Sequence, residues 1–192
     1  MNNKITNILL VGVGGQGILL ASEILSETFM LAGFDVKKSE IHGMSQRGGS
    51  VVSHVRFGRE VSSPIIRDGE ADILFGFELL ETFRYLSLVR EGGRIVANNL
   101  QIPPPAVLAG KEKYPEGVVE KIRERFPDFL LVNGVEVATA AGNSRAANTV
   151  LLGAVSRRLD IEERYWLDAL RKMVPAKAVD VNLTAFRMGR NL

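Results

Sequence analysis

Gly12-Val13-Gly14-Gly15-Gln16-Gly17 is the stretch that decides the fold of this 192-residue chain. An apolar run over residues 5–11 precedes it and predicts a buried strand. Residues 16–32 follow, with apolar side chains on one face, and predict a helix. A second strand is expected over residues 34–41, near a sheet edge because it is only weakly apolar. Strand, glycine turn, helix and strand form a βαβ unit, which indicates an α/β protein.

The rest of the chain continues to alternate strands and helices. Residues 50–57 alternate in polarity, and Gly58-Arg59 predicts a hairpin turn with a returning strand over residues 60–63. Pro103-Pro104-Pro105 predicts an extended surface segment. Further strands are expected over residues 72–77, 94–98 and 129–132, and helices over 79–88, 117–126, 135–141, 145–159, 161–174 and 178–189. Without a linker or repeat, residues 1–192 are expected to form one domain, a Rossmann-like, doubly wound, mostly parallel sheet with an inserted β-hairpin.

Composition excludes several classes of function. The chain has no cysteine, which excludes disulfides, a cysteine nucleophile and cysteine-ligated iron–sulfur clusters in this chain. With only two histidines, a zinc site would need unusual carboxylate help, so we expect no metal site. The net charge of +2 is too small to indicate nucleic acid. With no signal peptide or membrane-spanning run apparent, we expect a cytoplasmic protein that does not bind membranes.

The first glycine loop has the G-x-G-x-x-G spacing of a dinucleotide-binding fingerprint. Glycines let backbone N–H groups approach a phosphate, and the following helix N-terminus favours negative charge. Glu40 lies about where a ribose-binding acid would sit. Binding of an anion, binding of NAD, and a tight turn that binds nothing all remain open. The candidate binding residues here are Gly12, Gly14, Gly15, Gln16 and Gly17.

A second glycine-rich loop, Glu40-Ile41-His42-Gly43-Met44-Ser45-Gln46-Arg47-Gly48-Gly49-Ser50, does not fit a free-standing dehydrogenase. Arg47 offers a fork of donors for a carboxylate or phosphate, although it could instead pair with Glu40. Arg47 and His42 are candidates for a catalytic role, which we leave unassigned. His54, in the middle of a strand, is expected to be structural or at an interface. The further binding candidates are Ser45, Gln46, Arg47, Gly48, Gly49, Ser50 and Asn98.

These motifs together resemble the gamma-type subunits of 2-oxoacid:ferredoxin oxidoreductases. Within that family the chain most resembles the beta subunit of indolepyruvate:ferredoxin oxidoreductase. The resemblance covers nearly the whole chain in order. Its other elements are Val52-Ser53-His54-Val55-Arg56-Phe57-Gly58, Asn98 with Ile102-Pro103-Pro104, Ala141-Gly142-Asn143, Asn148-Thr149-Val150-Leu151-Leu152-Gly153-Ala154 and Val174-Pro175-Ala176-Lys177.

The resemblance implies one subunit of an enzyme that oxidatively decarboxylates an aryl 2-oxoacid to an acyl-CoA and passes electrons to ferredoxin. Thiamine diphosphate, magnesium and the iron–sulfur clusters would belong to a large partner subunit, and coenzyme A would be a substrate. This chain would hold no tightly bound cofactor and would be inactive alone. Isolated from its partner, it could pair with itself as a homodimer.

Other assignments stay open at this point. Within the family, the chain could be a gamma subunit for pyruvate, 2-oxoglutarate or a branched-chain 2-oxoacid. From another class, it could be a free-standing NAD-binding Rossmann dehydrogenase. A third possibility is a pure assembly role, in which the crevice between the loops docks the partner and binds no ligand.

Overall fold

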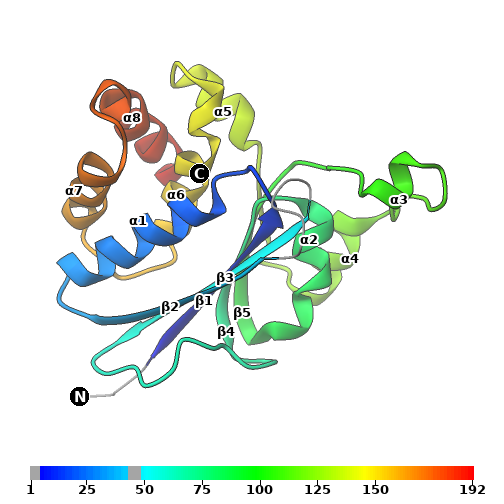
Figure 1. Ribbon diagram of the computed structural model, residues 1–192, viewed down its shortest axis with the longest axis horizontal. Coiled ribbons are helices and arrows are strands. Elements are labelled where there is room, and N and C mark those ends of the chain that lie inside the picture. The colour runs from blue at the N-terminus through cyan, green and yellow to red at the C-terminus, as the bar shows by residue number, and fades with distance from the viewer. Residues whose placement is uncertain (1–4, 43–48) are drawn as a thin grey trace.

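The computed structural model describes residues 5–42 and 49–192, apart from the side chain of His42. One six-stranded sheet, in the order β2-β3-β1-β4-β5-β6, carries helices on both faces (Figure 1). Its strands are β1 (Thr6–Val13), β2 (Asp35–His42), β3 (Ser50–Gly58), β4 (Ala71–Gly76), β5 (Val89–Asn98) and β6 (Leu130–Val132). The helices are α1 (Ile18–Leu31), α2 (Leu79–Arg84), α3 (Pro105–Leu108), α4 (Val118–Arg125), α5 (Gly134–Ala140), α6 (Ala147–Ser156), α7 (Glu163–Met173) and α8 (Val179–Arg190). Single 3₁₀ turns are η1 (Leu86–Leu88), η2 (Ser144–Ala146) and η3 (Ala176–Ala178).

The sheet is mixed, and the predicted hairpin is placed differently from our expectation. β1, β4, β5 and β6 pair in parallel, whereas β3 is antiparallel to both β1 and β2. The hairpin therefore joins β2 to β3, and β2 forms the expected edge strand. The returning strand predicted over residues 60–63 is wrong, because β1 and β2 already occupy both edges of β3.

The segment after β3 instead crosses one face of that strand. The Arg56 guanidinium donates to the carbonyl oxygens of Ser63 and Ile65, at 2.8 and 3.1 Å. The Ile66 N–H donates to Nδ1 of His54 at 3.2 Å. These contacts provide hydrogen-bond partners for backbone N–H and C=O groups of the irregular segment, which in a strand would pair with a neighbouring strand. The polar side chains of β3 therefore fix the course of this loop.

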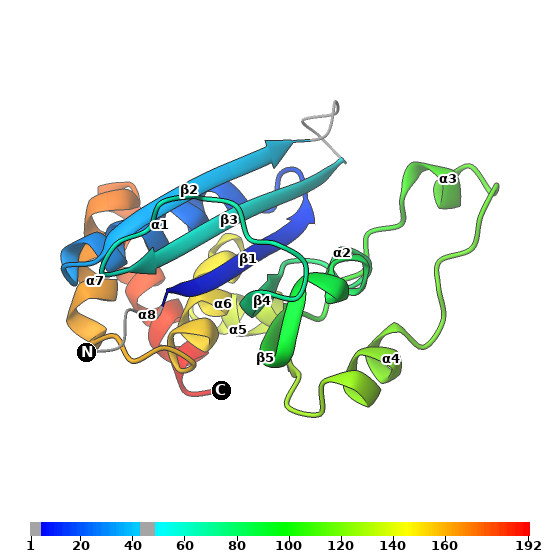
Figure 2. The same cartoon turned by 90° about the horizontal axis from the view of Figure 1, so that it is seen from below.

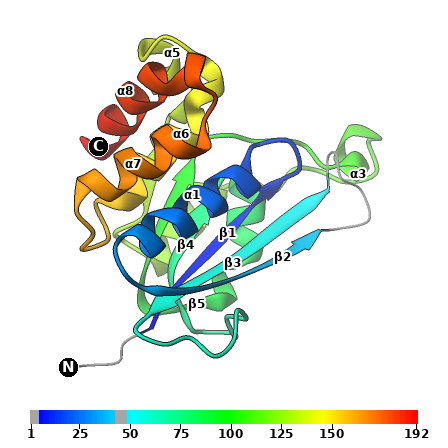
Figure 3. The ribbon, with the colours of Figure 1, turned by 60° about the vertical axis from the view of Figure 1, so that its left-hand side comes forward.

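Alternation along β1 sends side chains to two separate cores. Ile8 and Leu10 join the core under α1, α6, α7 and α8, while Leu9 and Val11 join the core under α2 and α4. Figures 1 and 3 show the same division, with α1 and α5 to α8 on one face of the sheet. Because these side chains of β1 are fully buried, the strand sits at the centre of the molecule.

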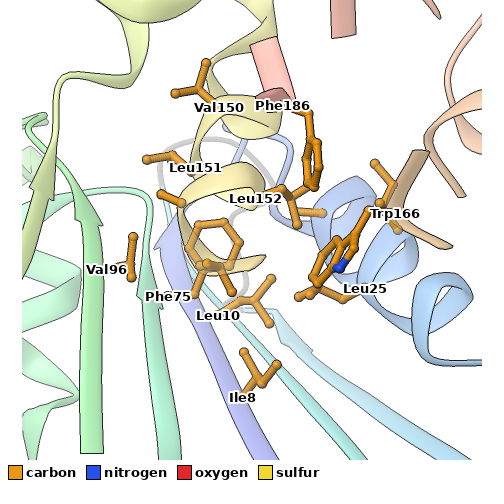
Figure 4. Packing of buried hydrophobic residues seen from close by; sticks show 14 of the residues in the cluster. Ile8, Leu10, Leu25, Phe75, Val96, Val150, Leu151, Leu152, Trp166 and Phe186 are labelled. Atoms are coloured by element: carbon orange, nitrogen blue, oxygen red, sulfur yellow. The ribbon is translucent and has the colours of Figure 1, made fainter. Parts of the chain in front are cut away.

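The larger core is built around aromatic rings and one close helix crossing. The Trp166 ring stacks on Phe186 with centroids 5.7 Å apart (Figure 4). The same ring makes an edge contact with Phe29, with centroids 6.0 Å apart. Helices α6 and α8 touch backbone to backbone, since a Cβ on Gly153 would lie 2.1 Å from the Phe186 carbonyl oxygen. Val150, Gly153 and Ala154 of α6 are buried, as is Ala146 of η2, just before the helix.

Residues 99–117 form an arm that projects away from the sheet (Figure 2). The triple proline leads into α3, whose first residue is Pro105, a position where the missing N–H costs nothing. Leu108 at the end of α3 is 75% exposed. The predicted surface segment is confirmed, with a single helical turn that was not expected.

Candidate functional site

The chain reverses its winding at the carboxyl ends of β1 and β4. The helix after β1, α1, packs on one face of the sheet, and the helix after β4, α2, packs on the other (Figure 1). The two connections therefore diverge and leave a crevice between them. In open α/β sheets this topological switch point is where ligands bind.

The first glycine-rich loop contacts the end of the second beside this crevice, on the β3 side of β1. The Gly14 N–H donates to the Gly49 carbonyl oxygen at 2.9 Å, next to the pairing of Val13 with Ser50. The strands that precede the two loops, β1 and β2, are not neighbours in the sheet, because β3 lies between them. The second loop reaches the first through the start of β3, which is antiparallel to β1.

The N-terminus of α1 opens into a cavity of about 530 Å³. Gly15 and Gly17 adopt φ values of 99° and 78°, a conformation that favours glycine, and no side chain caps the helix. The first N–H groups of a helix lack intrahelical partners, so they are available to an anion in this cavity. The described residues lining the cavity are Gly14, Gly15, Gly17, Ile18, Leu19, Leu20 and Val51.

Gln16 and Gly12 act on the shape of the loop. The Gln16 side chain accepts from the Val13 N–H at 2.7 Å and donates to the Phe77 carbonyl oxygen at 2.8 Å. A Cβ on Gly12 would lie 2.6 Å from Gln16 Oε1 and 2.8 Å from the Cβ of Phe77. Gln16 thereby links β1 to the end of β4 across the switch point, and a ligand contact for it stays a prediction.

Two more predicted binding residues have partners inside the chain. Ser50 donates to Glu81 at 2.6 Å, and Glu81 also accepts from Arg84. Asn98 is 4% exposed and accepts from the Gly134 N–H at 3.0 Å through Oδ1. Ser50 thus faces α2, whereas Asn98 holds the start of α5, so the two lie in different parts of the crevice.

Sequence reasoning missed the buried carboxylates of α2. Glu78 is 1% exposed and Glu81 4%. Glu78 caps α2 through the Glu81 N–H, and its other oxygen accepts from the Ile102 N–H at 3.1 Å and the Tyr114 hydroxyl at 2.8 Å. Burial and the Glu78 carboxylate raise the pKa of the Tyr114 hydroxyl. The sequence signal that could have pointed to Glu78 was its position, because it follows the β4 strand almost directly.

Glu40 and His54 are also engaged within the chain. The Glu40 carboxylate lies 2.8 Å from the Lys38 ammonium and accepts from the Ser22 hydroxyl at 3.3 Å. His54 is 4% exposed, and burial, with Arg56 nearby, lowers the pKa of its imidazole. Since its Nδ1 accepts from Ile66, His54 is held neutral, and it packs as a structural residue.

The remaining candidates, Ser45, Gln46, Arg47, Gly48 and the side chain of His42, lie outside the described residues. Among residues 5–42 and 49–192 there is no group of three or more His, Asp or Glu side chains that could hold a metal ion. Across the same residues, every helix is too short or too polar to cross a bilayer.

The switch point, the glycine loop and the helix behind it define the class as a Rossmann-like α/β protein. Residues 7–192 match the family model described as pyruvate ferredoxin/flavodoxin oxidoreductase. The chain belongs to this family. Its match begins within β1 and extends over all the later elements.

The relatives are subunits of 2-oxoacid oxidoreductases. Indolepyruvate oxidoreductase subunit IorB of Pyrococcus horikoshii is 39% identical over 188 residues, which cover 95% of this chain and 93% of that protein. The common gamma subunit of the pyruvate/ketoisovalerate oxidoreductases of Thermococcus litoralis is 28% identical, over 78% and 76%. The crystal structure of the keto/oxoacid ferredoxin oxidoreductase gamma subunit of Geobacter sulfurreducens is 26% identical with a TM-score of 0.69, covering 97% and 96%.

Proposed function

We propose that this chain is the cluster-free subunit of an indolepyruvate:ferredoxin oxidoreductase and is active only when docked on a large catalytic subunit. The sequence identities favour indolepyruvate as the substrate. The IorB relative is 39% identical over 95% of the chain, and the pyruvate/ketoisovalerate gamma subunit is 28% identical over 78%. Lack of cysteine supports the division of labour, because this chain cannot ligate an iron–sulfur cluster through cysteine.

In the assembled enzyme, the bond between the 2-oxo carbon and the carboxylate breaks and carbon dioxide leaves. A thioester forms with coenzyme A, whose thiol gives up its proton, and two electrons pass to ferredoxin. Thiamine diphosphate and the clusters, both in the large subunit, supply the carbanion chemistry and the electron path. This chain contributes a crevice that binds one anionic end of a substrate.

The observation that carries the proposal is the contact between Gly14 and Gly49, which joins the two glycine loops at the uncapped N-terminus of α1. That geometry provides backbone donors and a favourable helix dipole for an anion. Arg47 belongs to the second loop in sequence, and we propose it as the charged contact to a coenzyme A phosphate or a substrate carboxylate.

Co-expression with the large subunit tests the assembly. Tagged chain is expected to retain the untagged large subunit, and the complex is expected to reduce a viologen with indolepyruvate and coenzyme A faster than with pyruvate, 2-oxoglutarate or a branched-chain 2-oxoacid. A preference for one of the other acids would overturn the substrate, and turnover by the chain alone with NAD would overturn the class of enzyme.

Arg47→Ala tests the charged contact in that complex. We expect the apparent affinity for coenzyme A or for the 2-oxoacid to fall about tenfold or more, the effect of losing one charge-assisted hydrogen bond. Arg123→Ala is the control, because Arg123 is exposed on α4 on the opposite face of the sheet from α1. Unchanged kinetics in both variants would overturn the role of Arg47.

A further inference from the structure

A second, smaller cavity lies at the carboxyl ends of β4 and β5 and measures about 170 Å³. Gln16 lines it, whereas Gly15 and Gly17 line the larger cavity, so the first glycine loop contributes to both. The lining residues that matter are Gln16, Phe77, Asn98, Ser144, Arg145 and Asn148. We name this hollow the Arg145 cavity. Four segments that are distant in sequence converge on it.

Arg145 is the one charged side chain among the described residues that line the cavity. Arg145 is exposed in η2, just before α6, and its guanidinium makes no hydrogen bond or ion pair within residues 5–42 and 49–192. No described lining residue carries a carboxylate. Arg84, in contrast, forms an ion pair with Glu81. An arginine left unpaired at the mouth of a concave site is suited to a carboxylate or phosphate.

Asn98 adds a buried donor to the same cavity. Its Oδ1 must face the Gly134 N–H, which donates to it at 3.0 Å, and this contact fixes the orientation of the amide. The Nδ2 group then remains as a donor, and it makes no hydrogen bond with another residue of the described part. Asn98 as a whole is only 4% exposed, but its Nδ2 atom is not fully buried, so this donor is accessible from the cavity to a ligand or water.

The size of the cavity limits what it can hold. Pockets for whole small-molecule ligands measure about 300–1,000 Å³. The Arg145 cavity, at about 170 Å³, is smaller and suits one compact group with a few ordered waters. A cavity of this size has room for one anionic group of a ligand, with the rest of that ligand extending outward.

We propose that the Arg145 cavity is a second anion subsite, distinct from the glycine-loop cavity, that binds one phosphate or carboxylate group of a substrate of the assembled enzyme. The proposal rests on the proposed function for the identity of that substrate. Coenzyme A offers phosphates and the 2-oxoacid offers a carboxylate, and the two share the chemistry that Arg145 and Asn98 would recognise.

Arg145→Gln in the two-subunit complex tests the subsite, with Arg123→Gln as the matched control. The melting temperatures of both variant chains are expected to equal that of the wild type, because both arginines are exposed. We expect Arg145→Gln to raise the KM for one substrate about tenfold and to leave the KM for the other unchanged. Arg145→Lys is expected to restore part of the loss.

A rise confined to coenzyme A identifies a phosphate, and a rise confined to the 2-oxoacid identifies a carboxylate. KM values that match those of Arg123→Gln for both substrates would overturn the subsite while leaving the proposed function intact. If the wild-type complex is inactive with every 2-oxoacid, the proposed function fails. The thermal shift of the chain with pyrophosphate then decides: a shift lost in Arg145→Gln supports the subsite, and no shift in the wild type overturns it.

Discussion

Gln16 offers a direct choice between a structural role and a ligand-binding role. Its amide joins the Val13 N–H, at 2.7 Å, to the Phe77 carbonyl oxygen, at 2.8 Å. Replacing it by alanine removes both hydrogen bonds and leaves one backbone donor and one backbone acceptor at the ends of β1 and β4 without this partner. Gln16→Glu keeps the acceptor for Val13 but replaces the donor to Phe77 by a second, charged acceptor.

The size of the effect follows from these two bonds. A neutral hydrogen bond contributes about 1 kcal/mol to the free energy of unfolding, so Gln16→Ala is expected to cost about 2 kcal/mol. For a domain of this length, about 1 kcal/mol lowers the melting temperature by roughly 2–4 °C, which gives a fall of about 4–8 °C. Gln16→Glu is expected to cost at least as much as Gln16→Ala, because its second carboxylate oxygen would face the Phe77 carbonyl oxygen with no proton between the two acceptors.

Unfolding in denaturant is followed by the fluorescence of Trp166, the sole tryptophan, which is fully buried. Gln101→Ala is the control, since Gln101 is exposed on the arm. The structural reasoning fails if Gln16→Ala unfolds like the wild type and yet raises the KM of the complex for coenzyme A or the 2-oxoacid. That result would make Gln16 a ligand donor, as its sequence position suggested.

Three further predictions concern buried positions. His54→Asn keeps an acceptor for the Ile66 N–H but does not titrate. Because burial lowers the pKa of His54, the stability of the wild type is expected to fall as the pH drops below about 6.5, whereas that of the variant should not fall for this reason. Equal pH profiles of the melting temperature in the two proteins would contradict this. Gly153→Ala is expected to lower the melting temperature through a cost of about 1–3 kcal/mol, since its Cβ would lie 2.1 Å from the Phe186 carbonyl oxygen; an unchanged value would refute the close crossing of α6 and α8. Glu78→Ala is expected to release both ends of the arm and to speed trypsin cleavage within residues 103–113, and an unaltered digestion rate would exclude this anchoring.

Local signals in the sequence were sufficient for the elements that build the crevice. The apolar run before Gly12 and the helical periodicity after it predict β1 and α1 because both are set by neighbours within a few residues. The same holds for α6, which lies within the helix predicted over residues 145–159.

Pairing between distant segments was not predictable in this way. Gly58-Arg59 carries a turn signal, but β3 pairs with β2 and β1. Pairing between segments distant in sequence, and not the local turn signal, therefore determined the neighbours of β3. The burial of Glu78 depends on Ile102 and Tyr114, which reach it from the arm. The local sequence does not reveal which carboxylate will be buried against partners from a distant segment.

The Arg145 cavity was likewise not predictable from the sequence. Asn98 was a candidate from the resemblance, whereas Arg145 carried no motif of its own. The two share a cavity because β5 ends beside the turn that precedes α6. Only the assembled fold brings these donors together with Gln16.

The most direct test of the central claim, that this chain works only as part of a two-subunit oxidoreductase, is a titration of purified large subunit with the chain. The rate of viologen reduction by indolepyruvate and coenzyme A is measured at each ratio. The rate is expected to be near zero for either protein alone and to rise to a plateau at a fixed stoichiometry. Full activity of the large subunit without the chain, or turnover by the chain without the large subunit, would contradict the claim.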